Sequence, residues 1–471
     1  MGHDIASCPQ SEVRVDYEAK AGPLELWRHS LGHGGINWRP LPPRVVDGIA
    51  RLRPRLVRIF LQEFFEVYPA AGRFNWARLD PFMDSFARTG AKVVAAIALK
   101  PPALYPRIEP ALWRPSDWGL WQGLVRELVR RYSVERQIVT HWEVGNETDI
   151  GENGGCPYLV PDPDDYFEYY RMTIAPVLEA FPRAKVGGPA TCWADSEPLP
   201  GLVERCRRGG ERLDFISWHH YNDDVARHAE GVAIARKLLD GFGAGGGGGG
   251  RRPEMFITEW SKSFEQVSVE ERAFDPRRAA QATAGVLAYL DAGADGTFYY
   301  HIQDQTFYHD DFRPFFTPKG LDLMNTHWNE VPHRFGLFGV GEEVRPQYFA
   351  FQMLGRMEDE RIAATSDSPA VRVLASRGRA EKAMRSGAAV LLVNYELPAS
   401  ADRIVTVKIG NLPAGRYTLA TWRIDSARRW DAAALELLPL EKREIDTPGA
   451  FRAQVFLPAD SVLLMRVEPV G

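Results

Sequence analysis

The stretch His141-Trp-Glu-Val-Gly-Asn-Glu147 decides the fold of this chain. It continues an apolar, β-leaning run that starts at Ile138, and it ends in a polar tip loosened by Gly145. Such a pattern is typical of a buried parallel strand that presents side chains at its carboxyl end. Glu254-Met-Phe-Ile-Thr-Glu-Trp260 has the same form, with Glu259 near its tip. In a β/α barrel these strand ends carry the catalytic groups, so we expect Glu147 and Glu259 to meet.

Strand-like and helix-like patterns alternate on both sides of these two stretches. Each expected strand is followed by a segment with helical spacing, and the strands are residues 24–37, 56–61, 92–99, 138–147, 184–189, 214–221, 254–260 and 296–303. Eight such pairs predict an α/β fold, a (β/α)8 TIM barrel over residues 24–358. The glycine run at residues 246–250 lies before a strand and lacks a following Lys-Ser/Thr, which indicates a flexible loop and no phosphate site.

The pattern changes after roughly residue 358. Short strand candidates separated by turn residues follow, without a helix-length pattern between them, and they predict a small antiparallel β-sandwich domain over residues 359–471. Residues 1–23 form an N-terminal segment in which Val13, Val15 and Tyr17 alternate. This alternation indicates a strand, which we expect to add to the sandwich.

Composition narrows the class of partner. The 471 residues are 45% hydrophobic and 25% charged, which suits a normal globular core. The net charge of −5 and the pI near 6.2 give no basic footprint for nucleic acid, and no stretch suits a membrane. Met1-Gly-His-Asp4 lacks the features of a signal peptide, so we expect a cytoplasmic protein, or a secreted or periplasmic one if a leader was removed. We expect a monomer or a small homo-oligomer.

Four scattered cysteines are too few for a disulfide framework or a zinc site. Cys156 and Cys192 each follow an expected strand at the same barrel end, so a bridge between them stays open beside the simpler expectation of free buried thiols. No metal and no organic cofactor is expected.

Two carboxyl groups on one barrel mouth indicate glycoside hydrolysis. One such group protonates the leaving oxygen, and the other attacks the anomeric carbon or activates water. A single Glu at a strand end is more often part of a surface salt bridge. Glu147 and Glu259 together, on the fourth and seventh strands of an eight-unit barrel, favour catalysis.

These two motifs resemble the signature of the clan of retaining barrel glycosidases. The closer resemblance is to family 39 glycoside hydrolases, the group of β-xylosidases and α-L-iduronidases. It spans roughly residues 24–357, and the trailing β-domain also fits. The stretches that carry it are Trp142-Glu-Val-Gly-Asn-Glu147, Asp214-Phe-Ile-Ser-Trp-His-His-Tyr221, Ile257-Thr-Glu-Trp-Ser261, Phe335-Gly-Leu-Phe338 and Arg345-Pro-Gln-Tyr-Phe-Ala-Phe351.

The resemblance implies roles for individual residues. Glu147 is similar to the acid/base of the family and Glu259 to its nucleophile. Asn146 matches the asparagine that bonds the sugar 2-hydroxyl. Residues that match the surroundings of the nucleophile are Arg58 on the second strand and His219 and Tyr221 on the sixth.

The chain departs from the family pattern at three positions. The family usually has Trp where Gly145 stands and Pro where Thr148 stands. Its Trp on the eighth strand has His301 as the nearest equivalent here. These differences leave the mechanism intact and leave the sugar specificity open, and we expect the bulk missing at Gly145 to affect the substrate.

Charge and hydrogen bonding predict how the two carboxyls differ. Arg58 and the Tyr221 hydroxyl should keep Glu259 ionised, and that charge should then raise the pKa of Glu147. We expect a carboxyl separation of about 5–5.5 Å, the retaining distance. Glu143 shares a strand with Glu147 but is interpreted as structural and paired with an Arg, because an ionised Glu inside a barrel must be paired.

Other candidates are weaker. His33, in the Gly-rich turn after the first strand, competes with an ordinary turn histidine. Further candidates for the cleft are Trp260, His301, Asp304, Trp328 and Glu330. Asp162, Asp164 and Asp165 lack calcium-loop spacing and are expected to cap a helix.

The sequence therefore predicts a retaining exo-glycoside hydrolase that acts on an oligosaccharide or glycoside with a β-linked xylosyl group, a β-xylosidase. Within the same class the alternatives are an iduronidase, a β-galactosidase or arabinopyranosidase, and an endo-acting polysaccharide hydrolase. A non-catalytic carbohydrate-binding protein is the alternative from another class.

Overall fold

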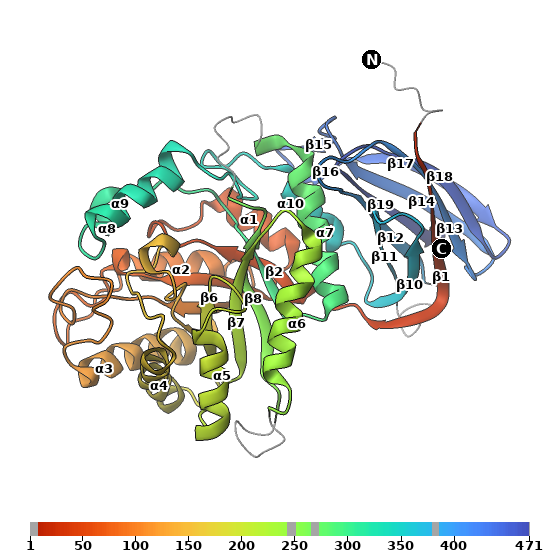
Figure 1. Ribbon diagram of the computed structural model, residues 1–471. Coiled ribbons are helices and arrows are strands. Elements are labelled where there is room, and N and C mark those ends of the chain that lie inside the picture. The colour runs from red at the N-terminus through yellow and green to blue at the C-terminus, as the bar shows by residue number, and fades with distance from the viewer. Residues whose placement is uncertain (1–7, 243–250, 265–272, 379–385, 471) are drawn as a thin grey trace.

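The protein has two parts that lie side by side, a helix-ringed barrel and a strand-rich domain (Figure 1). The structure is a computed structural model, and it describes residues 8–242, 251–264, 273–378 and 386–470. The glycine run at residues 246–250 lies outside the described residues. None of the helices within these ranges combines the length and the apolarity that a membrane span requires.

The barrel is closed by parallel strands, which confirms the predicted TIM barrel. Its strands are β2 (His29–His33), β3 (Leu56–Leu61), β4 (Lys92–Ile97), β5 (Val139–Val144), β6 (Lys185–Thr191), β7 (Phe215–Tyr221), β8 (Glu254–Ser261) and β9 (Gly296–Tyr300). The apolar strand residues are buried on both faces, one toward the barrel interior and one toward the helices. All of their carboxyl ends therefore open on one mouth.

Most of the helices surround the barrel, while one of them, over residues 318–325, reaches the mouth. They are α1 (Pro43–Leu52), α2 (Leu79–Ala87), α3 (Trp118–Val129), α4 (Pro163–Ala180), α5 (Pro198–Gly209), α6 (His228–Leu239), α7 (Pro276–Ala292), α8 (His309–Phe312), α9 (Pro318–Asn325) and α10 (Pro346–Leu354). The carboxylate of Asp162 accepts hydrogen bonds from the N–H groups of Asp164 and Asp165 at 2.8 and 3.0 Å. Asp162 therefore caps α4, and Asp164 and Asp165 lie in its first turn, so the acidic cluster marks a helix start as its sequence predicted.

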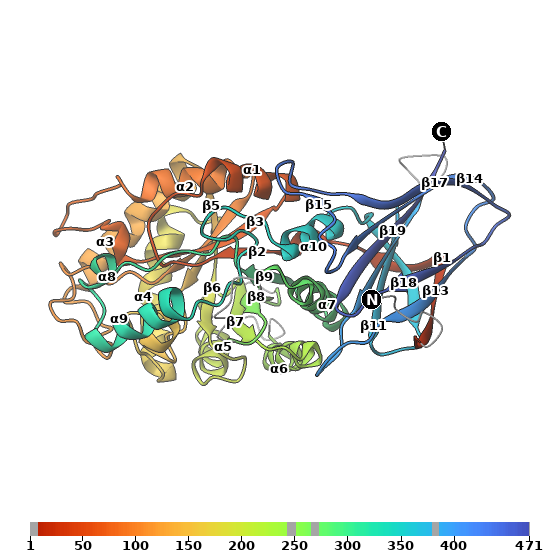
Figure 2. The ribbon, with the colours of Figure 1, turned by 90° about the horizontal axis from the view of Figure 1, so that it is seen from above.

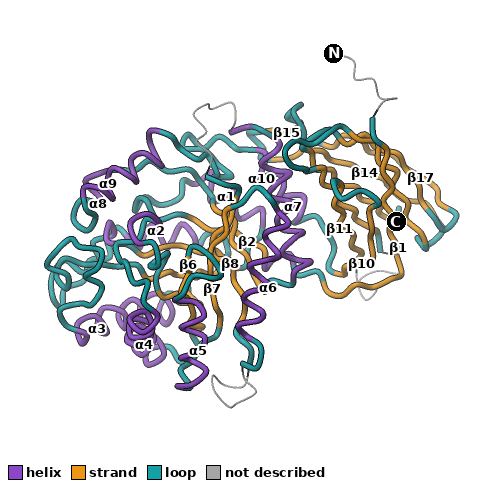
Figure 3. Tube along the Cα trace, viewed as in Figure 1, coloured by secondary structure: helices purple, strands orange, loops and turns teal. Residues whose placement is uncertain are grey.

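The second part is a mostly antiparallel sheet. Its strands are β1 (Gln10–Pro23), β10 (Glu360–Ser366), β11 (Val371–Arg377), β12 (Ala388–Asn394), β13 (Arg403–Gly410), β14 (Gly415–Ile424), β17 (Pro439–Thr447), β18 (Phe451–Leu457) and β19 (Ser461–Pro469), with a small hairpin of β15 (Trp430–Asp431) and β16 (Glu436–Leu437). The N-terminal strand β1 lies between two strands of this sheet, antiparallel to β10 and parallel to β13. Figure 3 shows this strand-rich domain beside the helix-ringed barrel.

The two parts share a core. Along β12, Val390 and Leu392 pack inside the strand-rich domain, while Leu391 and Val393 pack against the barrel. Both faces of β12 are thus covered, which explains its continuous apolar sequence. Figure 2 shows α7 between the barrel strands and the sheet. An ion pair of 2.6 Å from Arg277 on α7 to Asp460 adds to this contact.

Candidate active site

Glu147 stands in a turn just after β5 ends. Gly145 has φ +90° and Glu147 has φ +45°, a left-handed conformation that is uncommon for a residue with a side chain. The N–H of Glu147 donates to the carbonyl of Ala190 at 2.8 Å, and its carbonyl accepts from the N–H of Gly151 at 2.9 Å. Main-chain bonds on both sides therefore hold the strained residue in place, as is common where a side chain is aimed for function.

Glu259, His219 and Tyr221 reach the same point from the neighbouring strands β7 and β8. His219 lies opposite Glu259 in the register of these strands. Residues two apart share a strand face, so Tyr221 follows His219 on the inner side of the barrel. Its hydroxyl donates to Oε2 of Glu259 at 2.6 Å.

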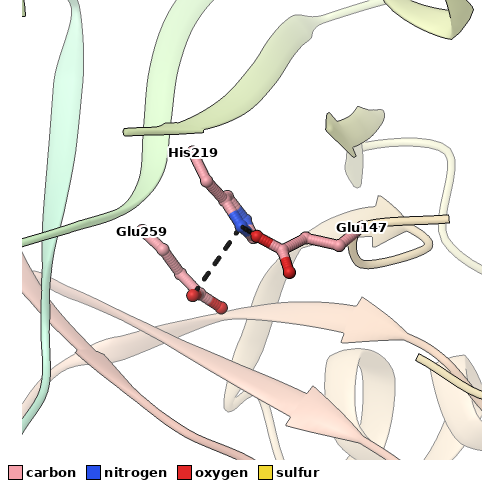
Figure 4. A group of neighbouring side chains, drawn as sticks. All are labelled: Glu147, His219 and Glu259. Atoms are coloured by element: carbon pink, nitrogen blue, oxygen red, sulfur yellow. Dashed lines mark hydrogen bonds and ion pairs between the residues drawn. The ribbon is translucent and has the colours of Figure 1, made fainter. Parts of the chain in front are cut away.

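The two carboxylates meet as the sequence predicts. Oxygens of Glu147 and Glu259 and a ring nitrogen of His219 all lie within 4.8 Å of one another. Nδ1 of His219 is 2.7 Å from Oε1 of Glu147 and 3.7 Å from Oε2 of Glu259, and Figure 4 shows the imidazole between the two carboxylates. This spacing is near the ~5–5.5 Å of retaining glycosidases and well short of the ~6.5–9.5 Å of inverting ones.

Arg58 on β3 orients three polar groups at the barrel centre. Its side chain is buried, and it donates to Glu259 at 2.6 Å, to Oδ1 of Asn146 at 2.7 Å and to Glu143 at 2.8 Å. Glu143 is fully buried in this pair, as expected for a structural carboxylate that neutralises an arginine. Arg58 thereby fixes Asn146 and Glu259 relative to each other.

The carboxyls differ in their electrostatic surroundings. Burial, followed by the charge of Asp149, raises the pKa of Glu147 to about 8. The sequence attributed this rise to the charge of Glu259, whereas burial and Asp149 are its main causes. Burial also raises the pKa of Glu259, but His219 and Arg58 oppose that rise. With a guanidinium and a phenol bonded to it, Glu259 carries the negative charge and Glu147 the proton.

A cavity of about 280 Å³ opens above the pair. Its wall is largely aromatic and aliphatic, and the lining residues are Gly35, Ile36, Phe60, Gln62, Glu147, Ile150, Asn153, Gly154, Gly155, Cys192, Tyr221, Glu259, Phe264, Tyr300, Met324, His327, Trp328 and His333. Met324, His327 and Trp328 come from the long segment between β9 and α10. This segment covers one side of the mouth.

Several sequence candidates lie outside the cavity wall. His33 bonds Gln305 and packs on Phe86, and His301 bonds Asp304. Asp304 also forms a buried ion pair of 2.5 Å with Arg345. These residues support the wall from behind.

Trp260 and Glu330 also point elsewhere. Trp260 is fully buried and packs edge-on against His228, Tyr289 and Tyr299, on the helix side of the barrel. The exposed Glu330 bonds Asn325 and Thr326 on its own segment.

The space beside Gly145 does not face the substrate. A Cβ at this position would meet Thr148 at 2.9 Å, the carbonyl of Pro189 at 3.7 Å and Tyr166 at 3.8 Å. The expectation that missing bulk at Gly145 affects the substrate is therefore wrong. With φ +90°, the glycine serves the turn that presents Glu147.

Sequence reasoning missed most of the cavity wall. Phe60 lies near the end of β3, and Gln62 and Cys192 directly follow strands, which is the same positional signal that singled out Glu147. Phe264 and His327 lie in irregular segments, where no periodicity marks them. Gly154 was also missed, although a Cβ there would lie 1.9 Å from Oε2 of Glu147.

The site geometry also bears on the two cysteines near the cavity and on metal binding. Cys156 and Cys192 are both free thiols, and Cys156 is buried as expected, whereas Cys192 is partly exposed. Glu147, His219 and Glu259 are close enough to ligate one cation. Arg58 and Tyr221 already occupy both oxygens of Glu259, so the arrangement suits a shared proton better than a metal.

The sequence comparisons both match this chain to glycoside hydrolases. Residues 56–235 match the sequence model described as Glycosyl hydrolases family 39. The chain is 24% identical over 358 residues to a beta-xylosidase of Caldicellulosiruptor saccharolyticus, over 71% of this chain and 67% of that protein.

Solved structures share the fold. A monomeric beta-xylosidase from Caulobacter crescentus CB15 aligns with a TM-score of 0.72 at 18% identity, over 98% of this chain and all of that one. A glucosidase from Croceicoccus marinus aligns with a TM-score of 0.72 at 21% identity, over 99% of this chain and all of that one.

Proposed function

We propose, from the premise that this chain belongs to glycosyl hydrolase family 39, that it is a retaining exo-acting β-xylosidase. Glu259 attacks the anomeric carbon while Glu147 donates its proton to the leaving oxygen, which gives a covalent glycosyl-enzyme. Glu147 then takes a proton from water as the water oxygen attacks the anomeric carbon and releases Glu259. Two inversions return the original configuration.

The observation that carries this proposal is the asymmetric carboxyl pair. The carboxylate oxygens lie within 4.8 Å of one another. The Glu259 carboxylate is bonded by Arg58 and Tyr221, while burial and Asp149 raise the pKa of Glu147 to about 8. Opposite protonation of two neighbouring carboxyls is what an acid and a nucleophile require at the same pH.

The cavity supports exo action on a small neutral sugar. Its volume of about 280 Å³ is at the low end for small-ligand pockets and favours a terminal sugar over the interior of a chain. Among the described residues that line it there is no Lys or Arg to bind a uronate carboxylate. The β-xylosidase names of the relatives from Caldicellulosiruptor and Caulobacter favour xylose as this sugar.

A panel of nitrophenyl glycosides tests the proposal. We expect the highest kcat/KM on the β-xyloside, lower values on the β-glucoside, β-galactoside and α-L-arabinopyranoside, and none on the iduronide. Proton NMR of the first product should show the β-anomer. Preference for another sugar would contradict the xylosidase assignment, an α-anomer would contradict retention, and sugar binding without turnover would favour a carbohydrate-binding protein.

A further inference from the structure

We propose that the side of the cavity next to Glu147 binds an aromatic leaving group, so that the preferred substrates are β-xylosides of aromatic alcohols and not xylo-oligosaccharides. The inference rests on the proposed double displacement and adds the chemical class of the group that leaves in its first step. It concerns the turn after β5 and the helix α9, which form this side of the cavity.

The position of Glu147 fixes where the leaving group lies. The acid protonates the glycosidic oxygen, so the group attached to that oxygen must lie beside the acid. The chain that follows Glu147 is itself part of the cavity wall, since the N–H of Ile150 donates to the carbonyl of Glu147 at 3.1 Å and Ile150 lines the cavity. Gly154 packs against the carboxyl, where a Cβ would lie 1.9 Å from Oε2. The leaving group therefore meets this turn.

Helix α9 completes the wall on this side. The carboxylate of Glu152, in the turn, accepts hydrogen bonds from the N–H of Thr317 at 2.6 Å and from its hydroxyl, at the start of α9. Met324, near the other end of α9, is buried and lies over the turn, because a Cβ at Gly155 would be 3.7 Å from its sulfur. Ile150 and Met324 thus present apolar surface beside the acid.

Polar groups that suit a sugar are scarce on this side. The carbonyl of Gly155 already accepts from the amide of Gln62 at 2.8 Å. Apart from Glu147, the polar side chains on this side, within the described part of the lining, are the thiol of Cys192, a weak donor, and the exposed Asn153. A sugar would leave hydroxyls without partners against the apolar surface, which weakens binding. An aromatic ring instead buries that surface and packs favourably on a thioether.

Aromatic side chains continue the apolar surface toward the mouth. His327, two residues beyond α9, faces Phe264 with ring centroids 6.4 Å apart, and Trp328 packs edge-on against Tyr300 at 6.2 Å. All four line the cavity. Phe264 is 50% exposed, so an apolar group at the mouth would cover it. An aromatic leaving group therefore has apolar and aromatic partners from the acid to the mouth.

Substrates with comparable leaving oxygens test the inference in the unmodified enzyme. Benzyl and methyl β-xylosides both release an unactivated alcohol, whereas xylobiose releases a sugar hydroxyl, which is the better leaving group. We expect kcat/KM on the benzyl xyloside to exceed that on the methyl xyloside by about tenfold or more, the effect of filling an apolar pocket, and to exceed that on xylobiose as well. A higher kcat/KM on xylobiose, or equal values on the benzyl and methyl xylosides, would overturn the inference.

Variants of α9 test the wall itself. Met324→Ala should lower the ratio of kcat/KM on benzyl to that on methyl β-xyloside by about tenfold, because it removes apolar surface from the pocket. Met324→Leu, which keeps that surface, should retain most of the ratio. Leu323→Ala is the control, since Leu323 precedes Met324 on α9 without being part of the described cavity lining, and it should leave the ratio unchanged. An unchanged ratio in the Met324→Ala enzyme would contradict the inference.

The trapped intermediate tests the same site with an acceptor. Glu259 is first esterified with a 2-deoxy-2-fluoro-β-xyloside. When an alcohol then attacks the anomeric carbon, Glu147 takes the alcohol proton, the bond to Glu259 breaks and a new glycoside leaves. Benzyl alcohol should accelerate this release more than the same concentration of xylose. Equal or greater acceleration by xylose would overturn the inference.

The two proposals fail in different ways. Absence of turnover on every glycoside would refute the proposed function. Retention with a preference for xylobiose would leave the function intact and refute the inference alone.

Discussion

At the scale of single residues, Glu147 and Glu259 differ in their hydrogen-bond partners and in the charges around them. Glu259 has two donors at 2.6 Å, Arg58 and Tyr221. Glu147 has the imidazole of His219, whose own pKa is lowered by burial, so no permanent cation is bonded to it. Two identical side chains thereby acquire opposite protonation, because their environments differ.

Removing each carboxyl should expose its role. Glu147→Gln should lower kcat/KM by about 10²–10⁴-fold on a glycoside with a poor leaving group and far less on a dinitrophenyl glycoside, which needs no protonation. Glu259→Gln should abolish turnover on both, since no covalent bond can form. Equal losses on the two substrates in both variants would contradict the assignment.

The pH profile should carry the same signature. Glu147 must be protonated to act as the acid, and its pKa is raised to about 8. The kcat/KM should therefore be maintained up to neutral pH and fall as the pH passes through about 8. An alkaline limb near the ordinary value of about 4.3 would contradict the raised pKa of Glu147.

At the scale of elements, the short helical turn Gly151–Gly154 packs against the acid. Gly154→Ala would place a Cβ 1.9 Å from Oε2 of Glu147. We expect kcat/KM to fall by about 10²-fold through displacement of the carboxyl. Gly123→Ala in α3 is the control, because its Cβ would meet nothing within 4 Å, and it should leave kcat/KM unchanged. A fully active Gly154→Ala enzyme would show that Glu147 tolerates displacement.

The helices and strands also show how much of the fold could be predicted from the sequence. Barrel strands were predictable because strand-like apolar runs alternate with helical patterns eight times. The strand β17 was missed because it is exposed and rich in charges, as edge strands often are. The segment with α8 and α9 does not alternate between strand and helix patterns, so its contribution to the cavity wall could not be predicted from the sequence.

Within the site, strand geometry explains both successes and misses. Glu147 and Glu259 were found because strand ends converge in a barrel. Trp260 was placed in the cleft although successive residues on a strand face opposite sides, so an inward Glu259 turns Trp260 outward. Asp149 was missed because its carboxylate accepts from the Cys192 N–H in the loop after β6, a long-range contact that no local pattern encodes.

At the scale of the whole molecule, the strand-rich domain and the barrel are joined by a shared hydrophobic core. The chain enters this domain at β1, builds the barrel and then returns, so β1 pairs with strands more than 300 residues away. The shared core at β12 and the bond from the Tyr395 hydroxyl to the carbonyl of Asp223 at 2.8 Å join the two parts. Cleavage of the chain at one position would therefore not separate the strand-rich domain from the barrel.

This unity predicts a single thermal transition. Leu391→Ala, on the face of β12 that packs on the barrel, should cost about 2–5 kcal/mol and lower the Tm of the whole protein. Calorimetry and intrinsic fluorescence should report the same midpoint. Two separate transitions, with only one of them moved by the substitution, would show that the domains unfold independently.

The most direct test of the account is the trapping of the covalent intermediate. Incubation with a 2-deoxy-2-fluoro-β-xyloside that carries a dinitrophenyl leaving group, followed by peptide mass spectrometry, locates the attached sugar. The account predicts one fluoroxylosyl group per chain, on the peptide that contains Glu259, with loss of activity at the same rate. Turnover without any covalent label, or a label on Glu147 or another residue, would contradict it.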